Sequence, residues 1–491
     1  MNFPTSQTML SSLTISEAHA KLKAKEISSE ELTRSCIERI EKVDGKLNAV
    51  VHRNFEYAID AAKKADKKGD FETPLSGIPY LAKDVFCEAG VPTTGCSNML
   101  REKNYISPFD STTTKRLKNA GAISIGKTNT DEFTMGASTE TSCYGPTRNP
   151  WDISRVAGGS SGGSAAAVSA DEAIFALGTD TGGSIRQPAG FCGIAGIRVT
   201  YGRTSRYGVM SMASSLDTIG PMCKSVTDLA IVLEAISGKD IMDGTTSEKP
   251  VEPYSKLQSN VKGLKIGLPK EYFIEGIRPD CEKAIRDAAA LYKSMGAELI
   301  DISLPHTKYA VATYYILCPS EVSSNMARYD GLRYGHTVKK PEDLVDYYQR
   351  ARSEGFGTEV KRRIMIGTYA LSAGYFDAYY LKAQKVRSLI RQDFEDAFKK
   401  VDVILSPVSP HPAFTVGANS ADPVAMYLED VFTVAQVMAG IPCLSVPCGM
   451  SKEGLPIGLQ LMGPQWGEAA ILNAAYAYEQ ATEWHTKKPT I

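Results

Sequence analysis

The amino-acid sequence predicts an α/β protein in which helices cover a largely buried sheet. Two patterns support this fold class. Short apolar runs closed by glycine or proline recur along the chain, and amphipathic segments long enough for helices separate many of them. The hydrophobic fraction of 43% and the charged fraction of 23% over 491 residues are those of a soluble globular chain with a large core.

The chain begins with helical segments. Ser28 and Glu31 have the spacing of a capping box, in which the serine accepts a free backbone amide and the glutamate reaches back to the cap. Apolar side chains then recur on one helical face, at Leu32, Cys36, Ile37 and Ile40. A second helix is expected over Phe55–Lys68 and ends at Gly69.

Strands and helices alternate in the rest of the chain. Strands are expected at the apolar runs 77–82, 122–125, 173–177, 264–268, 403–405, 444–446 and 457–461. Helices are expected at residues 112–119 and 281–295, between such runs, and at residues 469–480, after the last of them. We find no internal repeat or low-complexity tract. The polar stretch 239–262, rich in proline, serine and glutamate, is the candidate boundary between two lobes.

The charge balance excludes some classes of function. Lys and Arg number 55 against 56 Asp and Glu, so no basic half exists to hold a nucleic acid directly. The ten cysteines form no CxxC pair and no Cys/His run at zinc spacing, which predicts buried free thiols and no metal site. The first 13 residues contain no Lys or Arg, and no apolar run is long enough to span a membrane. We therefore expect a cytoplasmic protein.

The most unusual segments are rich in glycine and serine. Residues 157–167 read AGGSSGGSAAA, and residues 178–188 read GTDTGGSIRQP. Dense glycine lets backbone amides converge on a ligand, as in anion and oxyanion sites. A flexible linker is the plain alternative, but a helix pattern and a strand pattern resume directly after the first segment.

Three known motifs match parts of the sequence poorly. A phosphate-binding P-loop needs a lysine after the glycines, and none is present. Residues 158–162 match the nucleophile elbow G-x-S-x-G, but we expect a loop rather than a strand directly before them, and the six histidines lie elsewhere. Ser259 and Lys262 match S-x-x-K, a pattern that is common by chance and here lies in a polar segment.

The remaining interpretation is a serine nucleophile that works without histidine. Such a serine needs a base, and a lysine can serve when it is neutral. Burial lowers a lysine pKa because the charged form loses its hydration. Lys83 ends the apolar run GIPYLAK and is placed to be desolvated. Taken alone, it would more often be a surface lysine at the end of a strand.

Together these features resemble the amidase signature family. Lys83, the run GGSSGGS and the motif from Asp180 to Ser184 all match, and Ser160 and Ser184 stand 24 positions apart as in that family. The resemblance covers about residues 13–482. It implies one large α/β domain over residues 1–491, with a mixed central β-sheet covered by helices on both faces.

The resemblance also implies catalytic roles. Ser184 would attack the amide carbonyl, Ser160 would lie in a cis peptide and relay protons, and Lys83 would be the base. The oxyanion hole would be formed by the backbone amides of Thr181, Gly182, Gly183 and Ser184.

Four further segments narrow the resemblance. Residues 127–136, 144–152, 200–208 and 323–335 are most similar to the subunits that hydrolyse glutamine in tRNA-dependent amidotransferases. The similarity implies that ammonia released here amidates Glu-tRNA(Gln) or Asp-tRNA(Asn) on a partner subunit. It also implies a heterotrimer with subunits B and C. The chain itself would need no cofactor, and ATP and Mg²⁺ would be used by the partner subunit.

Glutamine carries an α-carboxylate and an α-ammonium, so its site needs a cation and an anion. The resemblance assigns these roles to Arg363 and Asp430, with Tyr314 as a further contact; an arginine fork suits a carboxylate. Residues 196–200 and 434–438 depart from the family pattern, which bears on the pocket rather than on the triad. The alternatives are a stand-alone amidase for other small carboxamides, a lipid amidase and a catalytically silent assembly subunit.

Overall fold

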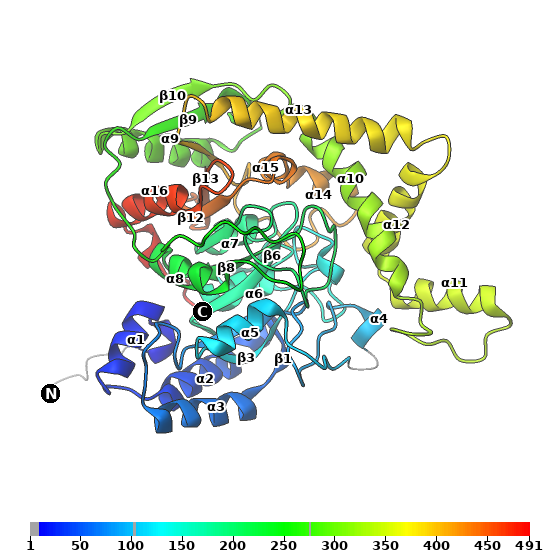
Figure 1. The fold of residues 1–491 in the computed structure, drawn as a ribbon, viewed down its shortest axis with the longest axis horizontal. Helices are drawn as coiled ribbons and strands as arrows, with labels where there is room; N and C mark the ends of the chain where they lie inside the picture. The colour runs from blue at the N-terminus through cyan, green and yellow to red at the C-terminus, as the bar shows by residue number, and fades with distance from the viewer. Residues whose placement is uncertain (1–8, 102–104, 274–275) are drawn as a thin grey trace.

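The computed structural model describes residues 9–101, 105–273 and 276–491, and one eleven-stranded sheet forms its centre (Figure 1). The strand order is β1-β3-β2-β6-β8-β7-β12-β13-β11-β9-β10. Strand β2 runs parallel to β3 and β6, and β9 runs parallel to β10 and β11, whereas the other pairs are antiparallel. The mixed sheet expected from the sequence is confirmed.

Each of the seven predicted apolar runs overlaps a strand of this sheet, and β4 and β5 form a separate two-stranded sheet. The strands are β1 Val50–Arg53, β2 Pro79–Lys83, β3 Ile123–Thr128, β4 Arg148–Asn149, β5 Asp152–Val156, β6 Phe175–Asp180, β7 Ala195–Arg198, β8 Thr218–Cys223, β9 Lys265–Pro269, β10 Glu298–Ile302, β11 Val403–Pro407, β12 Cys443–Met450 and β13 Pro456–Met462. Two central strands, β7 and β8, were not predicted because glycine and proline interrupt their apolar pattern.

The predicted helices are also present: two have the predicted bounds, and the bounds of two others differ by one or two residues. The helices are α1 Ile15–Lys23, α2 Ser29–Leu47, α3 Phe55–Lys68, α4 Asn98–Arg101, α5 Thr112–Asn119, α6 Gly162–Ser169, α7 Arg186–Cys192, α8 Val226–Ile236, α9 Pro279–Ser294, α10 Ala310–Asn325, α11 Leu344–Gly355, α12 Thr358–Leu371, α13 Lys382–Ala397, α14 Pro423–Leu428, α15 Val434–Ala439 and α16 Glu468–Gln480. The capping box at Ser28 and Glu31 forms as expected, and Gly69 ends α3 in a left-handed conformation.

Two groups of helices flank the sheet. Helices α6 and α7 contact each other and pack on strands from β2 to β13, while α5, α8, α16 and α9 contact one another in turn along the sheet. Helices α12 and α13 both pack on α10 and form a group beside the sheet, whereas α11 contacts α4. Helices α10, α11 and α12 extend to the right in Figure 1. The candidate site lies at the ends of β2 and β6, where Tyr314 of α10 comes close to Gly182 in the loop after β6. The polar stretch 239–262 contains no helix or strand, and the strands before and after it belong to the same sheet.

One expectation about the glycine-rich segment was wrong. A strand, β5, lies directly before it and pairs with β4, where we expected a loop. The polar and half-exposed sequence of β5 lacks the apolar pattern of a buried strand. The pair β4–β5 stands apart from the eleven-stranded sheet, so it does not provide the buried sheet strand from which a nucleophile elbow rises.

Two findings concern the chain as a whole. Nine of the ten cysteines are buried, as predicted, and all ten are unpaired. Within residues 9–101, 105–273 and 276–491, no helix has both the length and the apolar character that crossing a bilayer requires.

Candidate active site

Lys83 is the last residue of β2 and is fully buried. Its Nζ donates hydrogen bonds to the hydroxyl oxygens of Ser160 at 2.7 Å, Ser161 at 2.9 Å and Thr179 at 2.9 Å. Thr179 belongs to β6, which runs parallel to β2, so the ends of two neighbouring strands meet the glycine-rich loop here. The structure therefore brings two of the predicted catalytic residues, Lys83 and Ser160, into direct contact.

The surroundings of Lys83 favour its neutral form. Burial lowers the pKa of Lys83 to about 7, although the carboxylates of Asp131 and Asp180 oppose this shift. The partners of the amine are neutral hydroxyl groups rather than acids. A large fraction of Lys83 is therefore neutral near pH 7, as a general base requires.

Ser160 lies in a tightly held loop between β5 and α6. The Gly159–Ser160 peptide bond is cis, as the family resemblance implies. The hydroxyl of Thr139 donates to the carbonyl of Gly158 at 2.8 Å and accepts from the amide of Gly162 at 3.1 Å, so it bridges the loop. The amide of Gly159 donates to the side-chain oxygen of Gln187 at 3.0 Å.

Ser184 lies in the loop between β6 and α7. Its carbonyl accepts the amide of Ser161 at 3.1 Å, which holds the two serine-bearing loops together. Ser184 is 8% exposed, whereas Lys83 and Ser160 are fully buried, so Ser184 lies closest to solvent. Among the described residues, the Ser184 hydroxyl has no hydrogen-bond partner. The structure thus leaves this hydroxyl free while it brings Lys83 and Ser160 together.

The loop from Thr181 to Ser184 presents backbone amides. The amides of Thr181, Gly182 and Ser184 have no acceptor within the described part of the chain, whereas the amide of Gly183 donates to Oδ1 of Asp180 at 3.1 Å. Both glycines are required by close contacts. A Cβ at Gly182 would lie 2.7 Å from the hydroxyl of Tyr314, and a Cβ at Gly183 would lie 2.4 Å from Oγ1 of Thr433.

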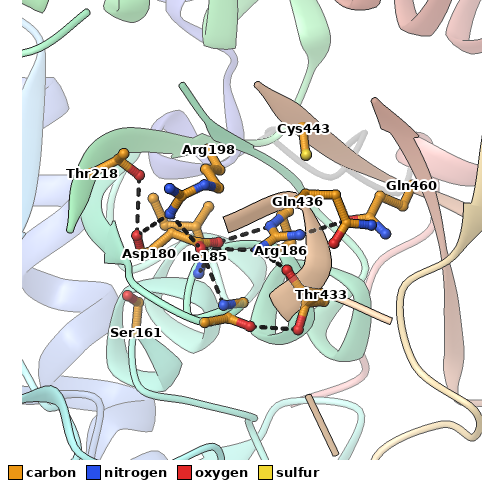
Figure 2. A network of polar contacts seen from close by, with 12 residues as sticks. Ser161, Asp180, Ile185, Arg186, Arg198, Thr218, Thr433, Gln436, Cys443 and Gln460 are labelled. Atoms are coloured by element: carbon orange, nitrogen blue, oxygen red, sulfur yellow. Dashed lines mark hydrogen bonds and ion pairs between the residues drawn. The ribbon is translucent and has the colours of Figure 1, made fainter. Parts of the chain in front are cut away.

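A buried ionic network shapes this loop (Figure 2). Asp180 accepts a bidentate pair of hydrogen bonds from Arg186, at 2.9 and 3.0 Å, and a further one from Arg198 at 3.2 Å. Burial alone would raise the pKa of Asp180, but the two arginines outweigh it and lower the pKa to about 2. Arg186 also donates to Gln460 at 2.6 Å and to the carbonyl of Thr433 at 2.9 Å, which ties the loop to β13 and α15.

Arg198 belongs to the segment 196–200 that departs from the family pattern. It is fully buried and also donates to the carbonyls of Asp180 at 2.5 Å and Leu216 at 3.1 Å. The segment that departs from the family pattern therefore contacts Asp180, at the base of the amide-bearing loop, and lies outside the triad.

The three residues predicted to bind glutamine come from distant segments and lie close together. Tyr314 and its neighbour Tyr315 are on α10, Arg363 is on α12, and Asp430 follows α14. The hydroxyl of Tyr315 donates to Asp430 at 2.8 Å, and the guanidinium of Arg363 lies over the ring of Tyr315, 5.3 Å from its centre. Tyr314 touches Gly182, so this group adjoins the amide-bearing loop.

Arg363 is not on a solvated helix face, since its side chain is only 3% exposed. Its Nε donates to Glu359 at 2.8 Å, and its terminal nitrogens Nη1 and Nη2 have no acceptor among the residues that the structure describes. Asp430 is also buried, and burial raises its pKa to about 7 against the opposing effects of Tyr315 and Arg363. The group thus offers a buried cation with two open donors and a carboxyl group that a ligand cation would ionise.

Several residues of this site were not identified from the sequence. Tyr315 stands beside the predicted Tyr314, and its role depends on which helix face meets Asp430. Arg186 lies in the quoted glycine-rich motif, but nothing in the motif shows that it pairs with Asp180. Thr433 contacts Gly182 in the loop, and Gln460 contacts Arg186 at the start of α7, each across more than 240 positions. No local signal in the sequence marks either of them.

A family model described as amidase matches residues 31–472 of this chain. The match covers most of the chain and includes the lysine, both serine-bearing loops and the Arg363 and Asp430 positions. The chain therefore belongs to the amidase family of enzymes.

Individual relatives narrow the comparison. The A-subunit of the glutamyl-tRNA(Gln) amidotransferase of Geobacter metallireducens is 56% identical, over 98% of this chain and 99% of that protein. The crystal structure of the corresponding A-subunit from Thermotoga maritima is similar with a TM-score of 0.80 at 39% identity, over 97% of this chain and 96% of that one. A peptide amidase solved with the competitive inhibitor chymostatin has a TM-score of 0.82 at 30% identity, over the full length of both chains.

Proposed function

We propose that this chain hydrolyses glutamine to glutamate and ammonia as one component of a tRNA-dependent amidotransferase. The proposal rests on one observation. Buried Arg363 and buried Asp430 lie close together, beside a loop in which three backbone amides have no acceptor among the described residues. An α-amino acid amide supplies the carboxylate and ammonium that these two groups need. The relatives at 56% and 39% identity, whose names are those of amidotransferase subunits, support the same substrate.

In the proposed reaction, neutral Lys83 accepts the proton of Ser160, and Ser160 takes the proton of Ser184. The Ser184 oxygen attacks the side-chain carbonyl of glutamine, and the open amides of Thr181, Gly182 and Ser184 stabilise the resulting oxyanion. The protons then return through Ser160 to the leaving nitrogen, which departs as ammonia. Water cleaves the acyl-enzyme by the reverse relay and releases glutamate. The hydrogen bond of 2.7 Å between Lys83 and Ser160 supports the first transfer.

Arg363 and Asp430 would orient the substrate. The open Nη1 and Nη2 atoms of Arg363 suit the α-carboxylate, and Asp430 suits the α-ammonium. Tyr314 would contact the bound substrate next to Gly182. The amide of Gly183 would enter the oxyanion hole only by sharing its present bond to Asp180.

The partners follow from the same proposal. Ammonia would pass to the B-subunit, which amidates Glu-tRNA(Gln) or Asp-tRNA(Asn) with ATP and Mg²⁺, within a cytoplasmic heterotrimer that also contains the C-subunit. The near-zero net charge of −1 supports tRNA binding through the partner rather than through this chain. The proposed chemistry of this chain uses no metal or cofactor.

Ammonia release from glutamine tests the catalytic assignment. We expect Ser184→Ala to abolish it, and Lys83→Ala to lower kcat by at least about a hundredfold, because each removes a group through which the protons or the acyl group must pass. Ser161→Ala is the matched control, since Ser161 also contacts Lys83 but has no step in the relay. Most activity retained in Ser184→Ala would contradict the mechanism.

The substrate assignment is tested by Arg363→Ala. We expect the KM for glutamine to rise at least about tenfold, because a charged hydrogen bond to the carboxylate is worth about 1.5–3 kcal/mol, while the KM for a neutral amide changes little. Arg362→Ala is the control, since Arg362 is the next residue and pairs with the same Glu359 but is 37% exposed. An equal effect of Arg363→Ala on both substrates would favour a stand-alone amidase for other small carboxamides.

A further inference from the structure

The peptide unit between Gly182 and Gly183 is held at both ends by different parts of the chain. Its N–H, from Gly183, donates to Oδ1 of Asp180 at 3.1 Å. Its carbonyl, from Gly182, accepts the hydroxyl of Thr433 at 2.5 Å. Asp180 lies in the same loop, whereas Thr433 comes from a segment 251 positions away, and it is fully buried.

This peptide lies between the two peptides that carry the open amides of Gly182 and Ser184. Its orientation therefore sets how these two amides point relative to each other. Both flanking residues are glycines, which restrict backbone rotation least, and Gly183 has a φ of +141°. Hydrogen bonds must supply the order that side chains do not. Preorganised donors stabilise an oxyanion because they do not have to turn toward it during the reaction.

Thr433 also belongs to the segment that carries Asp430. Its amide donates to the carbonyl of Asp430 at 3.0 Å, and its hydroxyl lies 3.2 Å from the same oxygen. Its own carbonyl accepts a hydrogen bond from Arg186 at 2.9 Å, within the network that surrounds Asp180 (Figure 2). A shift of the Asp430 segment therefore changes the hydrogen bond that Thr433 makes to Gly182.

We propose that Thr433 is a positioning residue, whose hydroxyl couples occupation of the ammonium site at Asp430 to the orientation of the oxyanion amides. The inference rests on the proposed function, because it takes glutamine as the ligand that fills the Asp430 site. Thr433 touches no reacting atom. It makes a substrate with a correctly placed ammonium group react faster than one without it.

The first test compares Thr433→Val with Thr433→Ser in the full-length chain. Valine keeps the shape of threonine and removes the hydroxyl, so we expect kcat for glutamine to fall about tenfold while KM changes less than about twofold, as for the loss of one hydrogen bond that matters in the transition state. Serine keeps the hydroxyl and should retain most of kcat. Unchanged kcat in Thr433→Val, or an equal loss in Thr433→Ser, would overturn the proposal.

Thr482→Val is the matched control for the substitution itself. The hydroxyl of Thr482 also donates to a backbone carbonyl, that of Tyr478 at 3.0 Å, but Thr482 lies just after the end of α16, outside the site. We expect this variant to keep wild-type kcat and KM. Thermal unfolding of both valine variants shows whether a lower kcat reflects a loss of folded protein.

The second test measures the coupling with glutaramate, which is glutamine without its α-ammonium group. We expect the wild type to turn over glutamine with a kcat about tenfold above that for glutaramate, and this ratio to approach about 1 in Thr433→Val. An unchanged ratio would overturn the coupling. Ammonia release from glutaramate but not from glutamine would contradict the proposed function instead.

Discussion

Lys83 and Asp430 are two buried groups whose pKa values both lie at about 7, the first lowered and the second raised from its ordinary value. Burial disfavours the ammonium form of Lys83 and the carboxylate form of Asp430 alike. The proposed reaction needs Lys83 neutral and Asp430 ionised. Each requirement is met as pH rises through 7, so the two titrations act in the same direction.

The pH dependence of glutamine hydrolysis follows from these two groups. Below pH 7, kcat/KM depends on the ionisation of both groups in the free enzyme. We therefore expect the logarithm of kcat/KM to rise with pH with a slope of about 2. In the complex the substrate ammonium keeps Asp430 ionised, so kcat should rise with a slope of about 1 and level off above pH 7. Steady-state kinetics from about pH 5.5 to about pH 9 measure both.

Asp430→Asn separates the two contributions. It removes one titration, so the slope of kcat/KM should fall to about 1 while the rise of kcat through pH 7 remains. A profile that is flat from about pH 5.5 to 7, or that falls as pH rises, would contradict the role of neutral Lys83.

At the scale of elements, the sequence predicted the strands better than it predicted what meets at their ends. The apolar runs that become β2 and β6 were identified, and parallel pairing of these strands places Lys83 and the loop after Asp180 at the same edge. Family motifs supplied the serines. Tyr315 and Thr433 were beyond prediction, because their roles arise from contacts with Asp430 and Gly182 across 115 and 251 positions. Periodicity and local motifs carry no information on such contacts.

Helix α12 shows how an element sets the position of a functional side chain. Its N-cap, Gly357, donates its amide to Glu132 at 2.8 Å, and a Cβ at Gly357 would lie 2.3 Å from the same carboxyl oxygen. Glu132 lies in one of the four segments that carried the closer resemblance. The contact fixes the start of α12 against the segment that contains Glu132. Arg363 lies in the second turn of the same helix.

Gly357→Ala should therefore displace α12. We expect the KM for glutamine to rise about threefold to tenfold with little change in kcat, and stability to fall by about 1–3 kcal/mol from overpacking. Gly45→Ala is the control, since Gly45 lies in α2 with no atom within 4 Å of the added Cβ. That change should leave KM unaltered and stabilise the helix by up to about 1 kcal/mol. An unchanged KM in Gly357→Ala would show that α12 does not set the position of Arg363.

At the scale of the whole molecule, segments near both ends of the described chain contact one buried ion pair, between Asp171 and Lys224. Asp171 lies 2.8 Å from Nζ of Lys224 and 2.7 Å from Nζ of Lys488, near the C-terminus. Lys224 in turn donates to the carbonyls of Ser11 and Leu13, near the start of the described residues. Burial would raise the pKa of Asp171, but the two lysines outweigh it and lower the pKa below its usual value.

Asp171→Asn should lower the stability of the protein and leave kcat for ammonia release unchanged. Lys224 is only 6% exposed and would lose its ionic partner, so we expect the free energy of unfolding at pH 7 to fall by about 3 kcal/mol. Because the pKa of Asp171 is lowered on folding, its contribution is present above the ordinary carboxyl pKa and is lost as pH falls below about 4.

Urea unfolding at pH 7 and at about pH 3.5 measures the change, and ammonia release measures kcat. The difference in stability between the wild type and Asp171→Asn should therefore narrow at the lower pH, while kcat at pH 7 stays the same because this cluster lies outside the site. Asp396→Asn is the control, since Asp396 forms an exposed pair with Lys399 and should change stability little. Equal stability of Asp171→Asn and the wild type at pH 7 would show that both ends of the described chain are held by apolar packing instead of by this carboxylate.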